Sequence, residues 1–258
     1  MHSLAHLSDL HLGSRGSRRA AAALVSQLHD VGTVLVTGDV TDAGKLDQWR
    51  LYRELFAPLQ DRLITLPGNH DRCGDDVAAL MVDRRVWTIE RPGLHLVCVD
   101  STAPHNRAPF RSHGELCAQV LDEIDAAVRS GPTDALRVVA MHHHPVPLPV
   151  EDVWEWFSDA FGWPNAAELG LGQTLLRRIL GECDVVLHGH RHVPRELVAD
   201  AHNGRPLRVL NAGATLQLGA WRVLDVAPGA YAHRWRHFEP SRRRVEVPVG
   251  ELALDTAA

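Results

Sequence analysis

Residues 63–71 read LITLPGNHD, an apolar run that a Pro-Gly pair ends and that three polar residues follow at once. The apolar run predicts a short buried strand, and the Pro-Gly pair predicts a tight turn at its end. Asn69, His70 and Asp71 therefore come just after the carboxyl end of a strand. In open α/β sheets this is the edge at which binding and catalytic sites assemble.

The same arrangement recurs at four other predicted strands. Polar side chains follow the apolar runs 4–7, 33–37, 138–141 and 185–187. These segments are Asp9-Leu10-His11, Gly38-Asp39, His142-His143-His144 and His188-Gly189-His190-Arg191-His192. Five strand ends that deliver carboxylate, amide and imidazole groups predict one shared site, and the glycines beside them permit close approach of the backbone.

Strand and helix patterns alternate along the chain and predict a layered α/β domain with a β-rich carboxyl-terminal part. Helices are expected at residues 18–29, 47–59, 114–129 and 171–180. Strands are expected at residues 4–7, 33–36, 63–66, 87–90, 94–100, 135–141, 184–187, 196–198, 207–210, 221–225, 231–238 and 245–249. Since no repeat or linker divides the 258 residues, a single domain spanning 1–258 is predicted.

The composition excludes several classes of protein. With 27 basic and 32 acidic side chains the net charge is −5, which disfavours a strongly basic nucleic-acid binder. The 45% hydrophobic content excludes a disordered chain, and no apolar run approaches the roughly 18 residues of a membrane span. The first residues lack the pattern of a secretory signal, and four dispersed cysteines predict buried thiols in a reducing compartment. We therefore expect a soluble cytoplasmic protein with no membrane partner.

The polar segments also predict a kind of chemistry. Seventeen histidines occur in the chain, and histidine is the commonest metal ligand. Carboxylates and imidazoles without thiolates suit Mn, Fe or Zn ions. Two such ions about 3.5–4 Å apart can stabilise the attacking and leaving oxygens of an in-line displacement, and they lower the pKa of a bound water towards about 7. The residues thus predict a two-metal centre.

In their order and spacing, the five segments resemble the calcineurin-like metallophosphoesterases, whose pattern is DxH…GD…GNH[DE]…H…GHxH. The resemblance implies a four-layer α/β/β/α sandwich. It implies one bridging carboxylate, Asp39, and two sets of metal ligands: Asp9, His11 and His192 for the first ion, and Asn69, His142 and His190 for the second. By the same resemblance His70 is a histidine that binds no metal, contacts the phosphate and protonates the leaving oxygen. Asp71 is expected to orient His70 by accepting its other ring proton.

The three adjacent histidines leave one assignment open. Counting from the preceding strand makes His142 the ligand, whereas counting back from Pro145 favours His143. We prefer His142, because a ligand at the end of a strand is held more rigidly than one further into a loop. His143 and His144 are then contacts to the ligands or the substrate, and His188, which matches no ligand position, is interpreted as a structural histidine.

Two further features have competing interpretations. Arg15, Arg18 and Arg72 lie near the predicted metal loops and are either phosphate-binding groups or solvated surface side chains, the latter being favoured for Arg18. The aromatic segment 150–163 is interpreted as a helix packing on its own core. The alternative is a lid or a homodimer contact within residues 150–170.

The predicted function is that of a metal-dependent phosphodiesterase acting on a small phosphorylated substrate, with a nucleotide among the candidates. The attacking group would be a hydroxide held by the two metals, with His70 assisting the leaving group. Among members of the family, the bacterial cyclic-nucleotide phosphodiesterases look most similar. A phosphomonoesterase and a nuclease are the alternatives, and the acidic net charge disfavours the nuclease. A non-catalytic scaffold is disfavoured because every ligand type is present.

Overall fold

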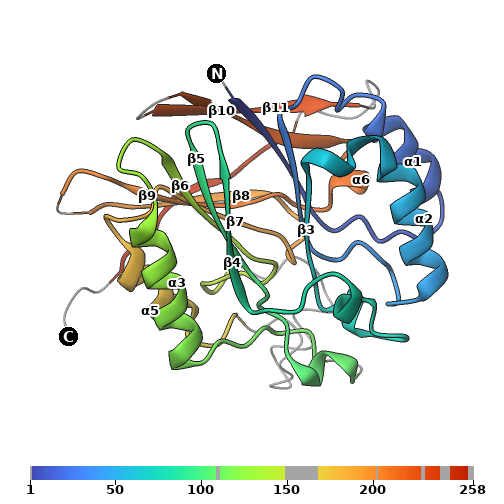
Figure 1. Ribbon diagram of the computed structural model, residues 1–258, viewed down its shortest axis with the longest axis horizontal. Helices are drawn as coiled ribbons and strands as arrows, with labels where there is room; N and C mark the ends of the chain where they lie inside the picture. Colours follow the sequence, from blue (N-terminus) through green and yellow to red (C-terminus); the bar gives the residue numbers. More distant parts are fainter. Residues whose placement is uncertain are drawn as a thin grey trace.

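The computed structural model describes residues 2–108, 111–148, 168–201, 203–227, 230–238 and 245–254. Two sheets lie face to face (Figure 1). The five-stranded sheet has the order β11-β10-β1-β2-β3, and the seven-stranded sheet has the order β12-β8-β9-β7-β6-β5-β4. Strands β1, β2 and β3 are parallel, as are β5, β6, β7 and β9.

The strand bounds are β1 His2–Leu7, β2 Thr33–Thr37, β3 Leu63–Leu66, β4 Val86–Arg91, β5 Leu94–Val99, β6 Leu136–Ala140, β7 Val185–His188, β8 Arg195–Ala199, β9 Leu207–Asn211, β10 Ala220–Ala227, β11 Ala230–His237 and β12 Val249–Glu251. The α-helices are α1 Ser17–Val25, α2 Leu46–Phe56, α3 Ala118–Ser130, α5 Gly172–Ile179 and α6 Thr215–Leu218. Short 3₁₀ helices span Ala57–Arg62, His70–Arg72, Val77–Leu80 and Pro104–Arg107.

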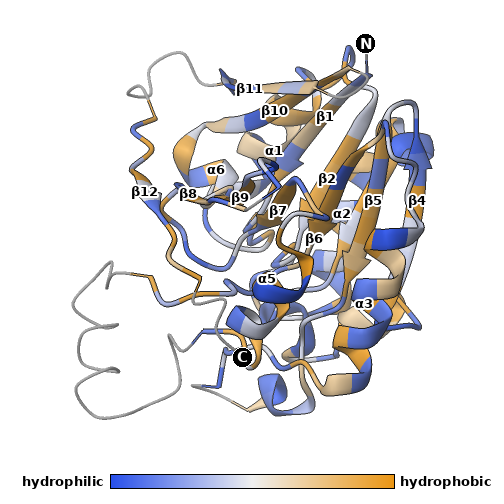
Figure 2. Ribbon diagram, turned by 90° about the vertical axis from the view of Figure 1, so that its left-hand side faces the viewer, coloured by the Kyte–Doolittle hydropathy of each residue, from blue (hydrophilic) through white to orange (hydrophobic). Residues whose placement is uncertain are grey.

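Three hydrophobic cores separate four layers. Successive residues of a strand point to opposite faces of its sheet, so Leu4 and Leu35 pack between the two sheets while Val34 and Val36 face α1 and α2. On the other side, α3 and α5 cover the seven-stranded sheet through residues such as Ile124. Figure 1 shows the two helix pairs on opposite sides of the sheets, and Figure 2 shows that the strands are largely hydrophobic whereas α3 and α5 also carry hydrophilic residues. The predicted α/β/β/α sandwich is confirmed.

The structure corrects several predicted element bounds. The helix predicted over 114–129 begins at Ala118, because the Glu115 amide donates to Ser101 O in a non-helical segment. The helix predicted over 18–29 ends at Val25. The strand predicted over 245–249 is wrong, since β12 starts at Val249, directly after a proline that has no amide to donate. The helix predicted over 47–59 is α-helical to Phe56 and continues as the 3₁₀ helix Ala57–Arg62. Helix α6 and the other three 3₁₀ helices were not expected from the sequence.

Two other predictions can be compared with the structure only in part. All four cysteines are free, as expected, but only Cys98 and Cys183 are buried, whereas Cys117 is exposed. The predicted aromatic segment 150–163 lies outside the described residues, so its role as a core helix, lid or dimer contact stays a prediction. Within the described residues no helix has the length and apolar character needed to cross a membrane.

Candidate metal centre

The predicted site residues come together where the parallel strands of both sheets end. Asp9 and His11 follow β1, Asp39 follows β2, and Asn69 follows β3. From the seven-stranded sheet, His142 follows β6, and His190 and His192 follow β7. Backbone hydrogen bonds tie these loops together, since Asp9 N donates to Gly38 O at 3.1 Å and His11 N donates to Asp39 O at 3.0 Å.

The backbone is in the left-handed region at four of the predicted ligands. Their φ angles are 51° at Asp9, 44° at His11, 49° at Asp39 and 69° at His190. Residues other than glycine rarely adopt this conformation, and it persists only where surrounding contacts hold it. Two glycines provide the room that the site needs: a Cβ at Gly68 would overlap the Asp39 carboxylate. A Cβ at Gly189 would overlap the side chain of Ser8 and lie 2.6 Å from Asp9 Oδ2.

The first cluster consists of Asp9, His11 and His192. The Nε2 atoms of the two histidines lie 3.2 Å apart, so their ring nitrogens converge on one point. Asp9 Oδ1 is 3.7 Å from His192 Nε2 and is a buried atom without a hydrogen bond among the described residues. A buried carboxylate oxygen without a donor is costly unless a cation neutralises it. The donor set therefore fits a metal ion.

The second cluster centres on the side-chain oxygen of Asn69. Asn69 Oδ1 lies 3.1 Å from His142 Nε2 and 2.9 Å from His190 Nδ1. Asp39 Oδ2 is 3.4 Å from the same His142 nitrogen, and Asp39 also groups with Asp9. Asp39 thus lies between the two clusters. An oxygen and nitrogen donor set without thiolates fits the ions expected from the sequence.

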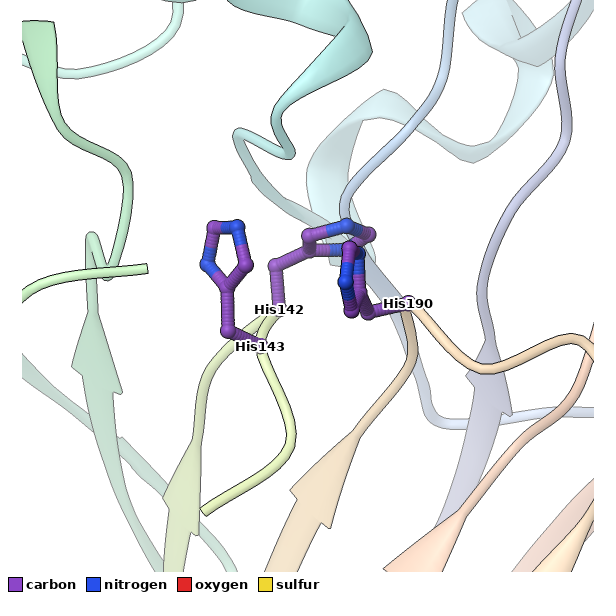
Figure 3. A group of neighbouring side chains, drawn as sticks. All are labelled: His142, His143 and His190. Carbon is purple, nitrogen blue, oxygen red and sulfur yellow. The ribbon is translucent and has the colours of Figure 1, made fainter. Parts of the chain in front are cut away.

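The geometry distinguishes between the two candidate histidines. His142 Nδ1 lies 2.7 Å from Thr37 O, so this nitrogen donates a hydrogen bond and Nε2 is left to face Asn69. Both nitrogens of His143 are occupied, Nδ1 at 2.8 Å from Ser101 Oγ and Nε2 at 2.8 Å from Ser112 O. In Figure 3 both side chains extend from the loop after β6, and both rings lie near that of His190, from the loop after β7. The hydrogen bonds, not the ring contacts, favour His142 as the ligand.

Buried carboxylates and imidazoles set the electrostatics of the site. Burial opposes the charge on His142, but the carboxylates of Asp39 and Asp9 outweigh this effect and raise its pKa to about 9. Burial lowers the pKa of His11 to about 3 and holds the pKa of His190 well below its ordinary value. The neutral imidazole is the form that binds a metal ion. Burial thus favours the neutral, metal-binding form of His11 and His190, whereas without a metal ion the two carboxylates favour the charged form of His142.

The predicted contact between His70 and Asp71 is wrong. His70 Nδ1 lies 2.7 Å from the backbone oxygen of Asp42 and donates to it. The 3₁₀ turn His70–Arg72 explains this, because with three residues per turn neighbouring side chains point about 120° apart. The partner that orients His70 is thus a backbone carbonyl, which no side-chain pattern reveals. His70 Nε2 has no hydrogen-bond partner within the described residues, and the residue is partly exposed.

Asp71 instead joins two of the loops that carry the site. It is fully buried, and its carboxylate accepts hydrogen bonds from the amides of Val40, Thr41 and Gly68 and from the Thr41 hydroxyl, at 2.7–3.2 Å. Burial, followed by the charge of Asp39, raises the pKa of Asp71. The loops after β2 and β3, which carry Asp39 and Asn69, are therefore held together by this carboxylate.

Replacing Asp71 with alanine is expected to destabilise the fold by about 3 kcal/mol or more, because each buried donor left without an acceptor costs about 1–3 kcal/mol. Urea unfolding followed by circular dichroism measures this change. Asp61→Ala, at an exposed position, is the matched control and should change the free energy of unfolding by less than about 0.5 kcal/mol. An Asp71→Ala variant as stable as the control would contradict the role as a link between loops.

The arginines near the site differ in their contacts. Arg72 donates to Thr102 Oγ1 at 2.8 Å and to Asp100 Oδ2 at 2.9 Å, so its guanidinium is already bound within the protein. Arg18 pairs with Glu54 at 3.3 Å on the surface, as favoured from the sequence. Arg15 lines a cavity beside the first cluster. His188 is buried and its Nδ1 lies 3.0 Å from Gly189 O, in keeping with a structural histidine.

Residues 2–194 match the family model described as calcineurin-like phosphoesterase. The chain belongs to the calcineurin-like phosphoesterase family. Like its named relatives, it is a phosphoester hydrolase, and the two side-chain clusters could hold its metal ions.

Relatives and solved structures agree with this family. The chain is 32% identical to the 3',5'-cyclic adenosine monophosphate phosphodiesterase CpdA of Pseudomonas aeruginosa, over 88% of this chain and 79% of that protein. It is 27% identical to a 3',5'-cyclic-nucleotide phosphodiesterase of Nostoc sp., over 78% of this chain and 74% of that protein. A purple acid phosphatase from yellow lupin has the same fold, with a TM-score of 0.67 at 13% identity, over 97% of this chain and 54% of that longer one.

Proposed function

We propose that this calcineurin-like phosphoesterase is a phosphodiesterase that hydrolyses small nucleotide diesters, cyclic nucleotides among them. One observation carries the proposal: six side chains form two clusters with Asp39 between them, and His70, whose Nε2 has no hydrogen-bond partner among the described residues, lies next to them. The names of the two relatives support the choice of a diester over a monoester, since both are cyclic-nucleotide phosphodiesterases.

Each residue then has a proposed role. Asp9, His11 and His192 would hold one ion, Asn69, His142 and His190 the other, and Asp39 both. When bound, two ions such as Mn²⁺, Fe²⁺/Fe³⁺ or Zn²⁺ supply Lewis acidity and an activated water. His70, fixed by its bond to Asp42 O, would donate the Nε2 proton to the leaving oxygen, and Asp71 would keep the loops of Asp39 and His70 in place. The free thiols support a reducing cytoplasm as the place of action.

Hydrolysis of three substrates by the chelator-treated chain tests this proposal. We expect Mn²⁺ to restore turnover of bis(p-nitrophenyl) phosphate and of 3',5'-cyclic AMP, with much less turnover of the monoester p-nitrophenyl phosphate. The Asp39→Asn variant, purified in parallel, controls for a contaminating hydrolase. Preference for the monoester would replace the diesterase with a phosphomonoesterase. Absence of turnover with Mn²⁺, Zn²⁺ and Fe²⁺ alike would contradict the proposed chemistry.

A further inference from the structure

A cavity of about 650 Å³ adjoins the first cluster. Asp9 and His11 form one end of its lining, and the rest comes from the segment leading into α1, from α6 and from the end of β11. Sites for small molecules in proteins have volumes of about 300–1,000 Å³. The cavity is therefore large enough for part of a substrate whose phosphate lies at the clusters.

The cavity carries positive charge that the protein does not neutralise. Arg15 and Arg19 line it, both are exposed, and neither forms a hydrogen bond or ion pair with the described residues. Arg18, which lies between them in the sequence, is instead paired with Glu54. The cavity also borders the start of α1, whose first turn has no acidic residue, so the helix dipole adds to the positive potential.

Part of the remaining lining is apolar, beside the polar side chains of Ser14, Ser17 and Gln217. Ala20 and Ala23 contribute one face of α1, and Leu216 and Phe238 lie among the same lining residues, both mostly buried. Such a surface packs against a flat or apolar group. Asp9, a predicted metal ligand, is the only carboxylate among the lining residues, so a leaving group with a positive charge, such as choline, finds no partner there.

We propose that this cavity binds the base of a nucleotide phosphodiester, and that Arg15 and Arg19 bind the ring acceptors of that base. The inference rests on the proposed function, because it assumes that the phosphate lies at the two clusters. A heterocyclic base combines a flat apolar face with nitrogen and oxygen acceptors at its edge. A planar guanidinium both stacks on such a ring and donates to its acceptors in a fork. Arg15 and Arg19 thus determine substrate choice without contacting the reacting bond.

Steady-state kinetics with two diesters tests the proposal. The variants are the Arg15→Ala/Arg19→Ala double variant and Arg18→Ala, the matched control on the same turn. The substrates are 3',5'-cyclic AMP and methyl p-nitrophenyl phosphate, which carries no base. We expect KM for cyclic AMP to rise about tenfold in the double variant, while kcat changes little. A tenfold weaker binding corresponds to the loss of about one charge-assisted hydrogen bond. The kinetics on the methyl ester, and those of Arg18→Ala on both substrates, should match the wild type.

Calorimetric titration with adenosine 5'-monophosphate gives a readout that needs no turnover. We expect the nucleotide to bind about tenfold more weakly to the double variant than to the wild type and Arg18→Ala. The base site would be contradicted if KM for both diesters changed equally in the double variant. It would also be contradicted if the wild type, the double variant and Arg18→Ala bound the nucleotide with equal affinity. Neither result would contradict the proposed phosphodiesterase activity. If neither diester is hydrolysed by the wild type, the proposed function fails, and the titration alone decides whether the cavity binds a nucleotide.

Discussion

Replacing Asp39 with asparagine is expected to lower metal-dependent phosphodiester hydrolysis by about a thousandfold or more, a loss of roughly 4 kcal/mol in transition-state stabilisation. The side chain is 2% exposed, its Oδ1 accepts the His70 amide at 2.8 Å, and its Oδ2 is 3.4 Å from His142 Nε2. Asparagine keeps the shape of the side chain but removes its charge. It also replaces one carboxylate oxygen by an amide NH2 group, which cannot bind a metal ion. The substitution therefore tests the bridging role directly.

Thermal unfolding separates this effect from a general loss of structure. A ligand at about 100 times its Kd stabilises a protein by about 2.7 kcal/mol. For a chain of this size that corresponds to a rise in Tm of roughly 5–10 °C when Mn²⁺ is added. The Asp39→Asn variant should fold without metal and lose most of this rise. His142 and His70 outweigh burial and hold the pKa of Asp39 well below its ordinary value, so the charge of Asp39 itself stabilises the fold, and the metal-free Tm of the variant is measured beside that of the wild type.

Asp61→Asn, the same substitution at an exposed position, is the control for both measurements. Its turnover and its Mn²⁺-induced rise in Tm should equal those of the wild type. If Asp39→Asn keeps turnover within about tenfold of the wild type, a loss below about 1.4 kcal/mol, then Asp39 does not bridge two ions. The two clusters would then act as separate sites, and the reaction would need a single ion.

Local patterns predicted a layered α/β domain and the meeting point of the loops, whereas the four-layer order was implied by the resemblance to the family. A short apolar run such as residues 63–66 is typical of a buried strand, and the Pro-Gly pair that follows the run indicates where the strand ends. Because parallel strands bring their carboxyl ends to one edge, Asp39 and His142 could be placed together although about a hundred residues separate them. The cavity at Arg15 and Arg19 could not be predicted, since it depends on how α1, α6 and β11 pack.

The errors arise where the backbone, not the side-chain pattern, decides the contact. The sequence places Asp71 next to His70, but the 3₁₀ turn directs Asp71 to Thr41 and Gly68 and leaves His70 to the carbonyl of Asp42. The start of α3 was missed for a similar reason, because backbone pairing with Ser101 outweighs the helical pattern of the preceding residues. Every residue has a backbone carbonyl, so the sequence does not reveal which carbonyl accepts a given hydrogen bond.

Replacing His70 with alanine is expected to lower kcat/KM for 3',5'-cyclic AMP by about 10²–10⁴-fold, the usual contribution of a general acid. The ring is held by its Nδ1 bond to Asp42 O, and its Nε2 forms no hydrogen bond with the residues that the structure describes. Burial opposes its charge, but Asp39 and the Asp42 carbonyl outweigh burial and raise the pKa of His70, which favours the protonated form that a donor needs. The sugar alkoxide expelled from a cyclic nucleotide is a poor leaving group and depends on this proton.

The leaving group distinguishes proton donation from simple phosphate contact. Bis(p-nitrophenyl) phosphate expels a stabilised phenolate that needs little protonation, so the same variant should lose much less activity on it. Across aryl diesters of rising leaving-group basicity, the rate of the variant should fall more steeply than that of the wild type, because only the wild type protonates the departing oxygen. His29→Ala, at an exposed position, should follow the wild type throughout. An equal loss on all diesters would mean that His70 contacts the phosphoryl oxygens and donates no proton to the leaving group.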